Sequence, residues 1–328
     1  MRSTSSKNST FVRSGSGDSM KPSRTTLRLA RAALQTAFAV SDELGTSLAE
    51  HWFITPRRHE RPARERAVLA SARAFSVDVE LRSPRWDGAR RTLAAWRWGF
   101  GPAVLLVHGW EGRGSQLGAF VEPLVAAGCS VVAFDAVGHG DSPDHRLYLT
   151  DFADCVAAVR DAVGPLHAII AHSFGAAAVL LAHARSGVDA PRNVLVAPNV
   201  LVADAVARFS SQLGLDDVDR AALERRIAAN AGLTGESLAL DRLAGARDSG
   251  LLVVHDRDDR EVAFAQGERV AAIWPDAQLH PTSGLGHRRV LRDADVIARA
   301  VAFVRHGLPM PASDLVREVD RWLDTPRR

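Results

Sequence analysis

The sequence predicts an α/β protein with a mostly parallel, doubly wound sheet, an all-helical cap insertion and an N-terminal helical extension. Three features indicate this class. Short apolar runs alternate with helical segments from residue 75 onward, the alternation stops after Pro198, and an amphipathic segment precedes the first strand. Repeated strand and helix units with continuous apolar strands are typical of a parallel sheet covered by helices on both faces.

The net positive charge of the chain comes from its first 31 residues. Residues 1–31 contain seven basic residues and one aspartate, so the remaining residues sum to −3 and give little support to nucleic-acid binding. Residues 1–24 lack apolar periodicity, which is typical of a disordered tail. Residues 25–53 have the periodicity of one amphipathic helix. We favour the interpretation that this helix packs on the α/β domain, and the alternatives are a lid over the site or a helix that contacts a membrane surface. With the basic linker 57–66, this segment forms a predicted extension over residues 25–74.

An export signal is the alternative for this segment, because basic residues precede an apolar stretch over residues 27–40. Charged and polar residues interrupt that stretch, so we expect a cytoplasmic protein. The sequence has no run of about 18 apolar residues that would predict a transmembrane helix. Its two cysteines, Cys129 and Cys155, form no secretory disulfide pattern and are expected to be buried.

The predicted core comprises residues 75–198 and 249–307. Strands are predicted over residues 77–81, 91–98, 103–107, 130–134, 166–171, 193–197, 250–255 and 277–280. Helices are predicted over residues 115–127, 148–163, 174–185, 261–273 and 290–304. The C-terminal segment 308–328 contains a predicted surface helix over residues 312–323.

Residues 199–248 interrupt the strand and helix pattern and form the predicted cap. They have helical periodicity and predict three helices, around residues 201–213, 223–231 and 238–243. This position puts the insert over the carboxyl ends of the strands, where ligands bind in open α/β sheets. We therefore expect the cap to govern which substrates reach the functional site.

The motif Ala171-His172-Ser173-Phe174-Gly175 lies between an apolar strand and a helix of small residues. A tight turn with a central serine in that context is typical of a nucleophile elbow. The strained turn requires small residues two positions before and after the serine, as Ala171 and Gly175 are. Ser173 is therefore the candidate nucleophile, and the alternative is an ordinary serine at the N-terminus of a helix.

His287 is the candidate general base, because the chain order for a nucleophile elbow is serine, acid, histidine. It follows Gly286 on a loop after the last predicted strand, and histidine can exchange a proton near neutral pH. His280, within or at the end of that strand, is the main alternative. His255 ends an earlier strand and fits the required order poorly.

These motifs resemble those of the α/β-hydrolases, and the resemblance covers roughly residues 75–307. The matching residues are the turn His108-Gly109, the loop over residues 135–142, the elbow around Ser173, Asp259, and the pair Gly286-His287. The resemblance implies a serine hydrolase that cleaves a carboxylic ester of a small molecule through an acyl-enzyme. The glycine-containing loop over residues 138–140 lacks the Lys-Ser/Thr pair of a P-loop, and no Cys/His cluster has zinc spacing, so we expect no cofactor and no metal.

The resemblance also implies the remaining site residues. The family pattern places the acid that orients His287 at Asp259, and the neighbouring Asp258 is the alternative. The backbone amides of Trp110 and Phe174 are expected to form the oxyanion hole.

Other functions of the same residues stay open at the level of the sequence. A thioesterase, a C–C hydrolase or an acyltransferase would use the same three side chains, whereas a non-catalytic binding module would not. A serine at the elbow argues against dehalogenase and epoxide-hydrolase chemistry, which needs a carboxylate nucleophile. Arg113, which follows the first motif closely, either binds a substrate carboxylate or, as we favour, is an ordinary surface arginine.

Overall fold

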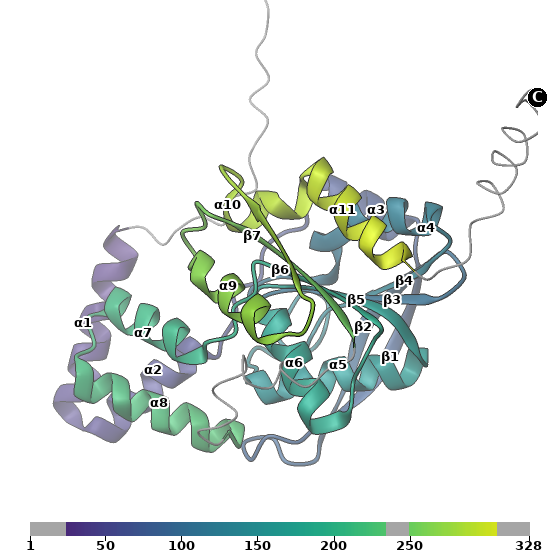
Figure 1. Cartoon of the computed structure of the whole chain (residues 1–328). Coiled ribbons are helices and arrows are strands. Elements are labelled where there is room, and N and C mark those ends of the chain that lie inside the picture. Colours follow the sequence, from purple (N-terminus) through teal and green to yellow (C-terminus); the bar gives the residue numbers. More distant parts are fainter. Residues whose placement is uncertain (1–23, 234–248, 307–328) are drawn as a thin grey trace, which may run out of the picture.

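The computed structural model describes residues 24–233 and 249–306, and within them it contains one eight-stranded sheet (Figure 1). The strands are β1 Arg73–Leu81, β2 Ala89–Trp98, β3 Ala103–Val107, β4 Ser130–Phe134, β5 Leu166–His172, β6 Arg192–Val196, β7 Gly250–Asp256 and β8 Gln278–Thr282. Their order is β1-β2-β4-β3-β5-β6-β7-β8. β1 pairs antiparallel with β2 and β2 with β4, and every other pairing is parallel. The predicted fold class is confirmed.

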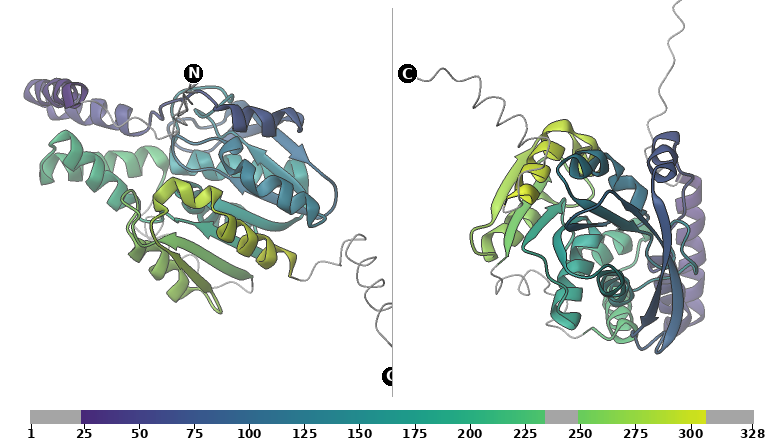
Figure 2. Two further views of the ribbon diagram at one scale, coloured as in Figure 1. Left: turned by 90° about the horizontal axis from the view of Figure 1, so that it is seen from above. Right: turned by 90° about the vertical axis from the view of Figure 1, so that its right-hand side faces the viewer.

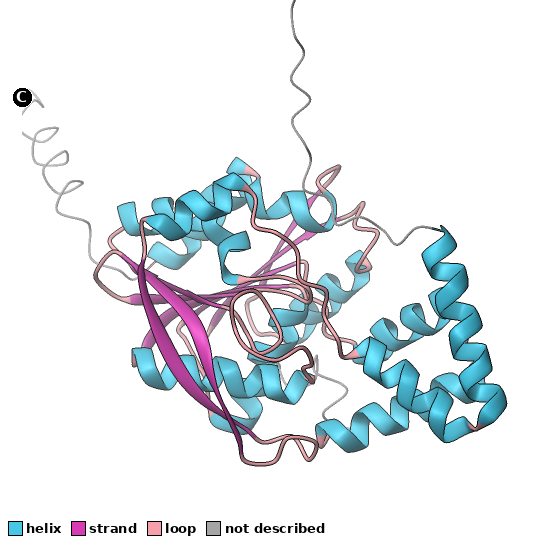
Figure 3. Ribbon diagram, turned by 180° about the vertical axis from the view of Figure 1, so that it is seen from behind, coloured by secondary structure: helices cyan, strands magenta, loops and turns pink. Residues whose placement is uncertain are grey.

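Helices cover both faces of the sheet (Figure 3). One layer contains α5 Leu149–Val163, α6 Phe174–Ser186 and α9 Phe264–Ile273, and the other contains α3 Ala63–Ala70, α4 Val121–Ala126 and α11 Ala294–Arg305. Successive side chains of a strand point to opposite faces. In β3, Leu105 packs into the first layer and Leu106 into the second, so the strand is buried on both sides.

The helix predicted over residues 115–127 is divided in the structure. A short 3-10 helix, η1 Gly114–Phe120, precedes α4. Proline is tolerated in the first turn of an α-helix but not in its interior, so Pro123 accounts for the start of α4 at Val121. A periodic apolar pattern alone does not reveal this break.

The single helix predicted over residues 25–53 is wrong. Two helices, α1 Arg24–Val40 and α2 Asp42–Phe53, meet at Ser41. Ser41 has an extended backbone, and its side chain accepts a hydrogen bond from the amide of Leu44 at 3.1 Å. A serine that caps a helix in this way satisfies an amide that the helix leaves unpaired, so the chain turns at this residue.

The cap begins with α7 Val202–Leu213 and α8 Asp217–Ala231, which lie beside the two N-terminal helices at one end of the molecule (Figures 1 and 2). The ring of Phe53 meets that of Phe209 edge-on, with centroids 5.3 Å apart. Arg31 donates a hydrogen bond from Nε to the carbonyl of Gln212 at 2.9 Å. The helices α1 and α2 therefore form one helical layer with α7 and α8 of the cap.

Glu50 of α2 connects this layer to the core. Its carboxylate is buried and accepts hydrogen bonds from the hydroxyl of Tyr148 at 2.9 Å, Nε of Arg226 at 2.7 Å and Nδ2 of Asn230 at 2.7 Å. Tyr148 precedes α5 of the core, whereas Arg226 and Asn230 belong to α8. One carboxylate thus holds three segments that lie far apart in the sequence.

Several predicted segments lie outside the described residues. They are the tail before residue 24, the third cap helix near residues 238–243 and the C-terminal helix over residues 312–323. Cys129 and Cys155 are free and buried, as expected. Among the described helices, none combines the length and the apolar composition that crossing a bilayer requires.

Candidate active site

Ser173 occupies a strained turn between β5 and α6. Its φ of 53° and ψ of −122° are a conformation that residues with a side chain rarely adopt. The turn brings Gly175 against the end of β3, the neighbouring strand, so that an added Cβ would lie 2.2 Å from the carbonyl oxygen of His108. Ala171, two residues before the serine, is fully buried and its methyl group fits. The sequence feature therefore has the local geometry of a nucleophile elbow.

His287 lies next to Ser173 in space. It belongs to the one-turn helix α10 Gly286–Arg289, and its Nε2 lies 2.9 Å from Ser173 Oγ. Its Nδ1 lies 2.7 Å from Oδ2 of Asp259. A carboxylate only accepts hydrogen bonds, so Nδ1 carries the proton and Nε2 is free to accept from the serine hydroxyl. His280, the alternative base, lies within β8.

The carboxylate of Asp259 is buried and hydrogen-bonded. The side chain is 0% exposed, and Oδ1 accepts hydrogen bonds from the amides of Glu261 at 2.7 Å and Val262 at 2.9 Å. Burial alone raises the pKa of Asp259, but hydrogen bonds from His255 and His287 outweigh it and hold that pKa well below its usual range. The carboxylate is therefore ionised at neutral pH.

The two neighbouring aspartates hold the loop that carries His287. Asp258 accepts a hydrogen bond from the amide of Gly284 at 2.8 Å. Asp256 accepts from the hydroxyl of Thr282 at 2.8 Å and from the amide of Leu285 at 3.0 Å. The structure thus brings Asp259, and not Asp258, to the imidazole.

The amides of Trp110 and Phe174 flank the serine. Trp110 follows β3, and an added Cβ on the preceding Gly109 would lie 3.0 Å from Ser173 Cβ. Phe174 is the first residue of α6, where amides have no partner inside the helix and point toward negative charge. Within the described residues, neither amide donates a hydrogen bond. Both are available for an oxyanion.

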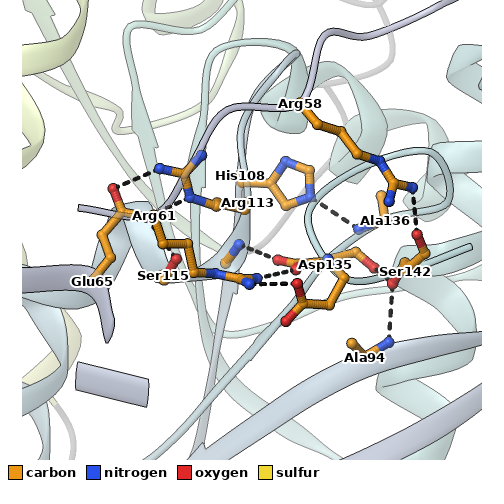
Figure 4. Close-up of polar contacts among 12 residues, drawn as sticks. Arg58, Arg61, Glu65, Ala94, His108, Arg113, Ser115, Asp135, Ala136 and Ser142 are labelled. Carbon is orange, nitrogen blue, oxygen red and sulfur yellow. Dashed lines mark hydrogen bonds and ion pairs between the residues drawn. The ribbon is translucent and has the colours of Figure 1, made fainter. Parts of the chain in front are cut away.

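Three further histidines are buried around these loops. His108 accepts a hydrogen bond from the amide of Ala136 at 3.0 Å (Figure 4), His139 accepts one from the amide of Glu111 at 3.2 Å, and the ring of His172 lies 3.0 Å from the carbonyl of His287. Burial lowers the pKa of His139 to about 4 and that of His172 to about 3, and it lowers the pKa of His108 strongly as well. Neutral rings in these places hold loops together.

The prediction of a surface position for Arg113 is wrong, and the arginine does not face the site as a carboxylate binder either. Its guanidinium is buried and pairs with Glu65 through contacts of 2.6 Å and 3.1 Å (Figure 4). Ser115 donates to the same carboxylate at 2.7 Å. The reason is that α3 folds over this loop and supplies the acid, which the local sequence around residue 113 does not reveal.

The basic linker holds the loops after β3 and β4. Arg61 pairs with the buried Asp135 at 2.7 Å (Figure 4). The same carboxylate accepts a hydrogen bond from the amide of Gly114 at 2.8 Å. Arg58 donates to the carbonyl of Ser142 at 2.6 Å. These arginines therefore act within the fold, and α3 begins inside the predicted linker at Ala63.

One residue near the site was missed by the sequence reasoning. His255, at the end of β7, is 0% exposed, and its Nε2 lies 3.4 Å from Oδ2 of Asp259. The chain order of serine, acid and histidine disfavours it as the base, because it precedes the acid. The sequence does contain a signal for this contact: His255 lies four residues before Asp259, at the end of a buried strand.

Comparisons with known proteins agree with the observed fold. A family model described as serine aminopeptidase, S33, matches residues 101–239. A bacterial membrane phospholipase A is similar in structure, with 19% identity, a TM-score of 0.53 and coverage of 74% of this chain and 88% of that one. A bromoperoxidase from Bacillus anthracis has 16% identity, a TM-score of 0.52 and coverage of 70% and 99%.

Est1E from Butyrivibrio proteoclasticus, solved with ferulic acid, has 17% identity, a TM-score of 0.50 and coverage of 66% and 94%. No curated protein matches the sequence. The strand order and these structural similarities define the fold. The chain has the α/β-hydrolase fold.

Proposed function

We propose that the protein is a serine hydrolase that cleaves a carboxylic ester through an acyl-enzyme. The observation that carries the proposal is the hydrogen-bond chain from Ser173 Oγ to His287 Nε2, and from His287 Nδ1 to Asp259. A serine hydroxyl is weakly nucleophilic unless a base lies within hydrogen-bonding reach. In this chain of hydrogen bonds, His287 is the base and Asp259 orients it.

In the proposed reaction, Ser173 Oγ attacks the ester carbonyl while its proton passes to His287 Nε2. The amides of Trp110 and Phe174 stabilise the oxyanion of the tetrahedral intermediate. The imidazolium, stabilised by Asp259, then donates the proton to the leaving alkoxide. Water attacks the acyl-enzyme in the same way, His287 again carries the proton, and the acid product leaves with the serine restored.

We favour esters over the other substrate classes because of the similarity in fold. One of the similar structures is that of a phospholipase A, so ester chemistry occurs on this architecture. Thioesters, C–C bonds and acyl transfer to an acceptor other than water would use the same three side chains. A panel of substrates separates these possibilities.

The test is labelling with a fluorophosphonate together with hydrolysis of p-nitrophenyl esters of graded chain length. We expect wild type to be labelled and to turn over the esters. Ser173→Ala is expected to abolish labelling and to lower kcat by about 10⁴-fold or more. Ser211→Ala, at an exposed serine of α7, is the matched control. Labelling that persists in Ser173→Ala would refute the nucleophile, and a folded wild type without labelling would favour a binding module.

We also propose that the N-terminal segment is retained and that the protein acts in the cytoplasm. Cleavage of an export signal at the end of the apolar stretch, near residue 40, would remove α1, whose Leu34 is 1% exposed and whose Arg31 donates a hydrogen bond to the cap. Intact mass of the native protein tests this. A mass that lacks the residues up to about 40 would identify an export signal instead.

A further inference from the structure

The carboxylate of Asp259 lies beside four N–H groups: three are joined to it by hydrogen bonds, and the fourth, on His255, lies 3.4 Å from Oδ2. Two are the amides of Glu261 and Val262 on Oδ1. The other two come from imidazole rings, His287 at 2.7 Å and His255 at 3.4 Å, and both face Oδ2. A carboxylate has about four acceptor positions, so these groups fill them.

The position of the proton on His255 follows from its surroundings. Nε2 faces two oxygens that can only accept, the carbonyl of Val262 at 3.2 Å and Oδ2 of Asp259 at 3.4 Å, so Nε2 carries the hydrogen. Nδ1 has no hydrogen-bond partner among the described residues and lies against Gly267, where an added Cβ would be 2.5 Å away. Phe264 packs edge-on against the ring at 5.6 Å. The ring has little room to turn.

From this arrangement we propose that His255 is a positioning residue of the triad: its Nε2–H donates to Oδ2 of Asp259 and fixes the carboxylate in the orientation that His287 needs. The inference rests on the proposed serine hydrolase function. The amides of Glu261 and Val262 hold Oδ1 only, and a carboxylate held at one oxygen can pivot about it. A second donor on Oδ2 removes that freedom.

A merely structural role for His255 makes a different prediction. If its N–H served only the carbonyl of Val262, replacing the ring would change the stability of the β7 loop and leave turnover per folded molecule unchanged. If it orients Asp259, replacement lowers kcat, because His287 is held less well against Ser173. KM changes little, because His255 is fully buried among Asp259, Val262 and Gly267 and is closed to a substrate.

The experiment compares His255→Phe with His255→Gln in the full-length protein. Phenylalanine keeps the ring without the donor, and glutamine places an amide N–H at the same distance along the side chain as Nε2. We expect Phe to lower kcat for a p-nitrophenyl ester by about 10²-fold, the usual effect of a misplaced catalytic group, with KM within about twofold of wild type. Glutamine should restore most of kcat. His280→Phe, on the adjacent strand β8, is the matched control.

The outcomes separate the two proposals. A folded His255→Phe protein with wild-type kcat overturns the positioning role, while loss of activity in Ser173→Ala leaves the hydrolase proposal standing. Turnover that survives Ser173→Ala defeats the hydrolase proposal itself. If the phenylalanine variant does not fold, His255→Asn tests the positioning role instead. The asparagine side chain is too short for its amide to reach Oδ2 of Asp259, so we expect a similar loss of kcat. A folded His255→Asn protein with wild-type kcat also overturns the inference.

Discussion

Nε2 of His287 lies 2.9 Å from Oγ of Ser173, although 114 residues separate the two along the chain. The serine follows β5 and the histidine follows β8, and the carboxyl ends of parallel strands meet at the same edge of a sheet. Because the sheet is rigid and buried, it sets this distance without help from a ligand. The geometry leads to predictions for the acid, the elbow, the cap and the buried histidines.

Replacing Asp259 by asparagine should lower kcat by about 10⁴-fold, because an amide N–H toward His287 favours the wrong tautomer of the imidazole. The neighbouring change Asp258→Asn should cost less than about tenfold, since the asparagine oxygen can still accept from the amide of Gly284. Steady-state kinetics of the two purified variants measures the difference. Equal losses would mean that the structure assigns the acid wrongly.

Gly175→Ala should be far more damaging than Ala171→Gly, although each changes one methyl group in the elbow. The added Cβ would lie 2.2 Å from the carbonyl oxygen of His108, so the backbone must move, at a cost of about 3 kcal/mol or more. Removing the buried methyl of Ala171 should cost about 1 kcal/mol. Urea unfolding of both variants gives the two free energies, and similar values would contradict the close contact.

Glu50→Ala should loosen the cap from the core. The change leaves the side chains of Arg226, Asn230 and Tyr148 without their shared acceptor, and we expect a loss of about 1–3 kcal/mol in the free energy of unfolding. Glu43 pairs with the same Arg226 but is 78% exposed, so Glu43→Ala should change stability by less than about 0.5 kcal/mol. Urea unfolding measures stability, and limited proteolysis of α8 measures the loosening. Equal effects of both variants would exclude a special role for Glu50.

Acid should destabilise the protein through its buried histidines. The pKa of His139 is lowered from 6.5 to about 4 in the folded state, so the unfolded chain takes up a proton first as the pH falls. The stability that this ring contributes is complete above pH 6.5 and is lost as the pH falls toward about 4, with a slope of about 1.4 kcal/mol per pH unit. His172, with a pKa lowered to about 3, acts in the same direction.

The variant His139→Gln should therefore reduce the slope of unfolding free energy against pH by about 1.4 kcal/mol per unit between pH 6 and pH 4.5. His145→Gln, a change at an exposed histidine, is the control. Urea titrations at four or more pH values within this range give the slopes. An unchanged slope in His139→Gln would show that the ring is protonated in the folded protein.

Local signals in the sequence were enough for most of the fold. The runs at residues 103–107 and 131–134 are apolar at every position, and the structure has strands over Ala103–Val107 and Ser130–Phe134, buried on both faces. The failures lie where a polar residue acts through a distant partner or a cap. Ser41 ends one helix by capping the next, and Arg113 is buried because Glu65 folds over it.

The sequence by itself determined the strands, the elbow around Ser173 and the order of the candidate acid and base, because these depend on residue type and spacing along one segment. Only the tertiary structure separates Asp259, which contacts His287, from the alternative Asp258. It alone also shows that His255 lies beside the same carboxylate and that α1 and α2 pack on the cap helices. The physical reason is distance. A hydrogen bond requires two atoms about 3 Å apart, and only the folded sheet brings residues from different strands that close.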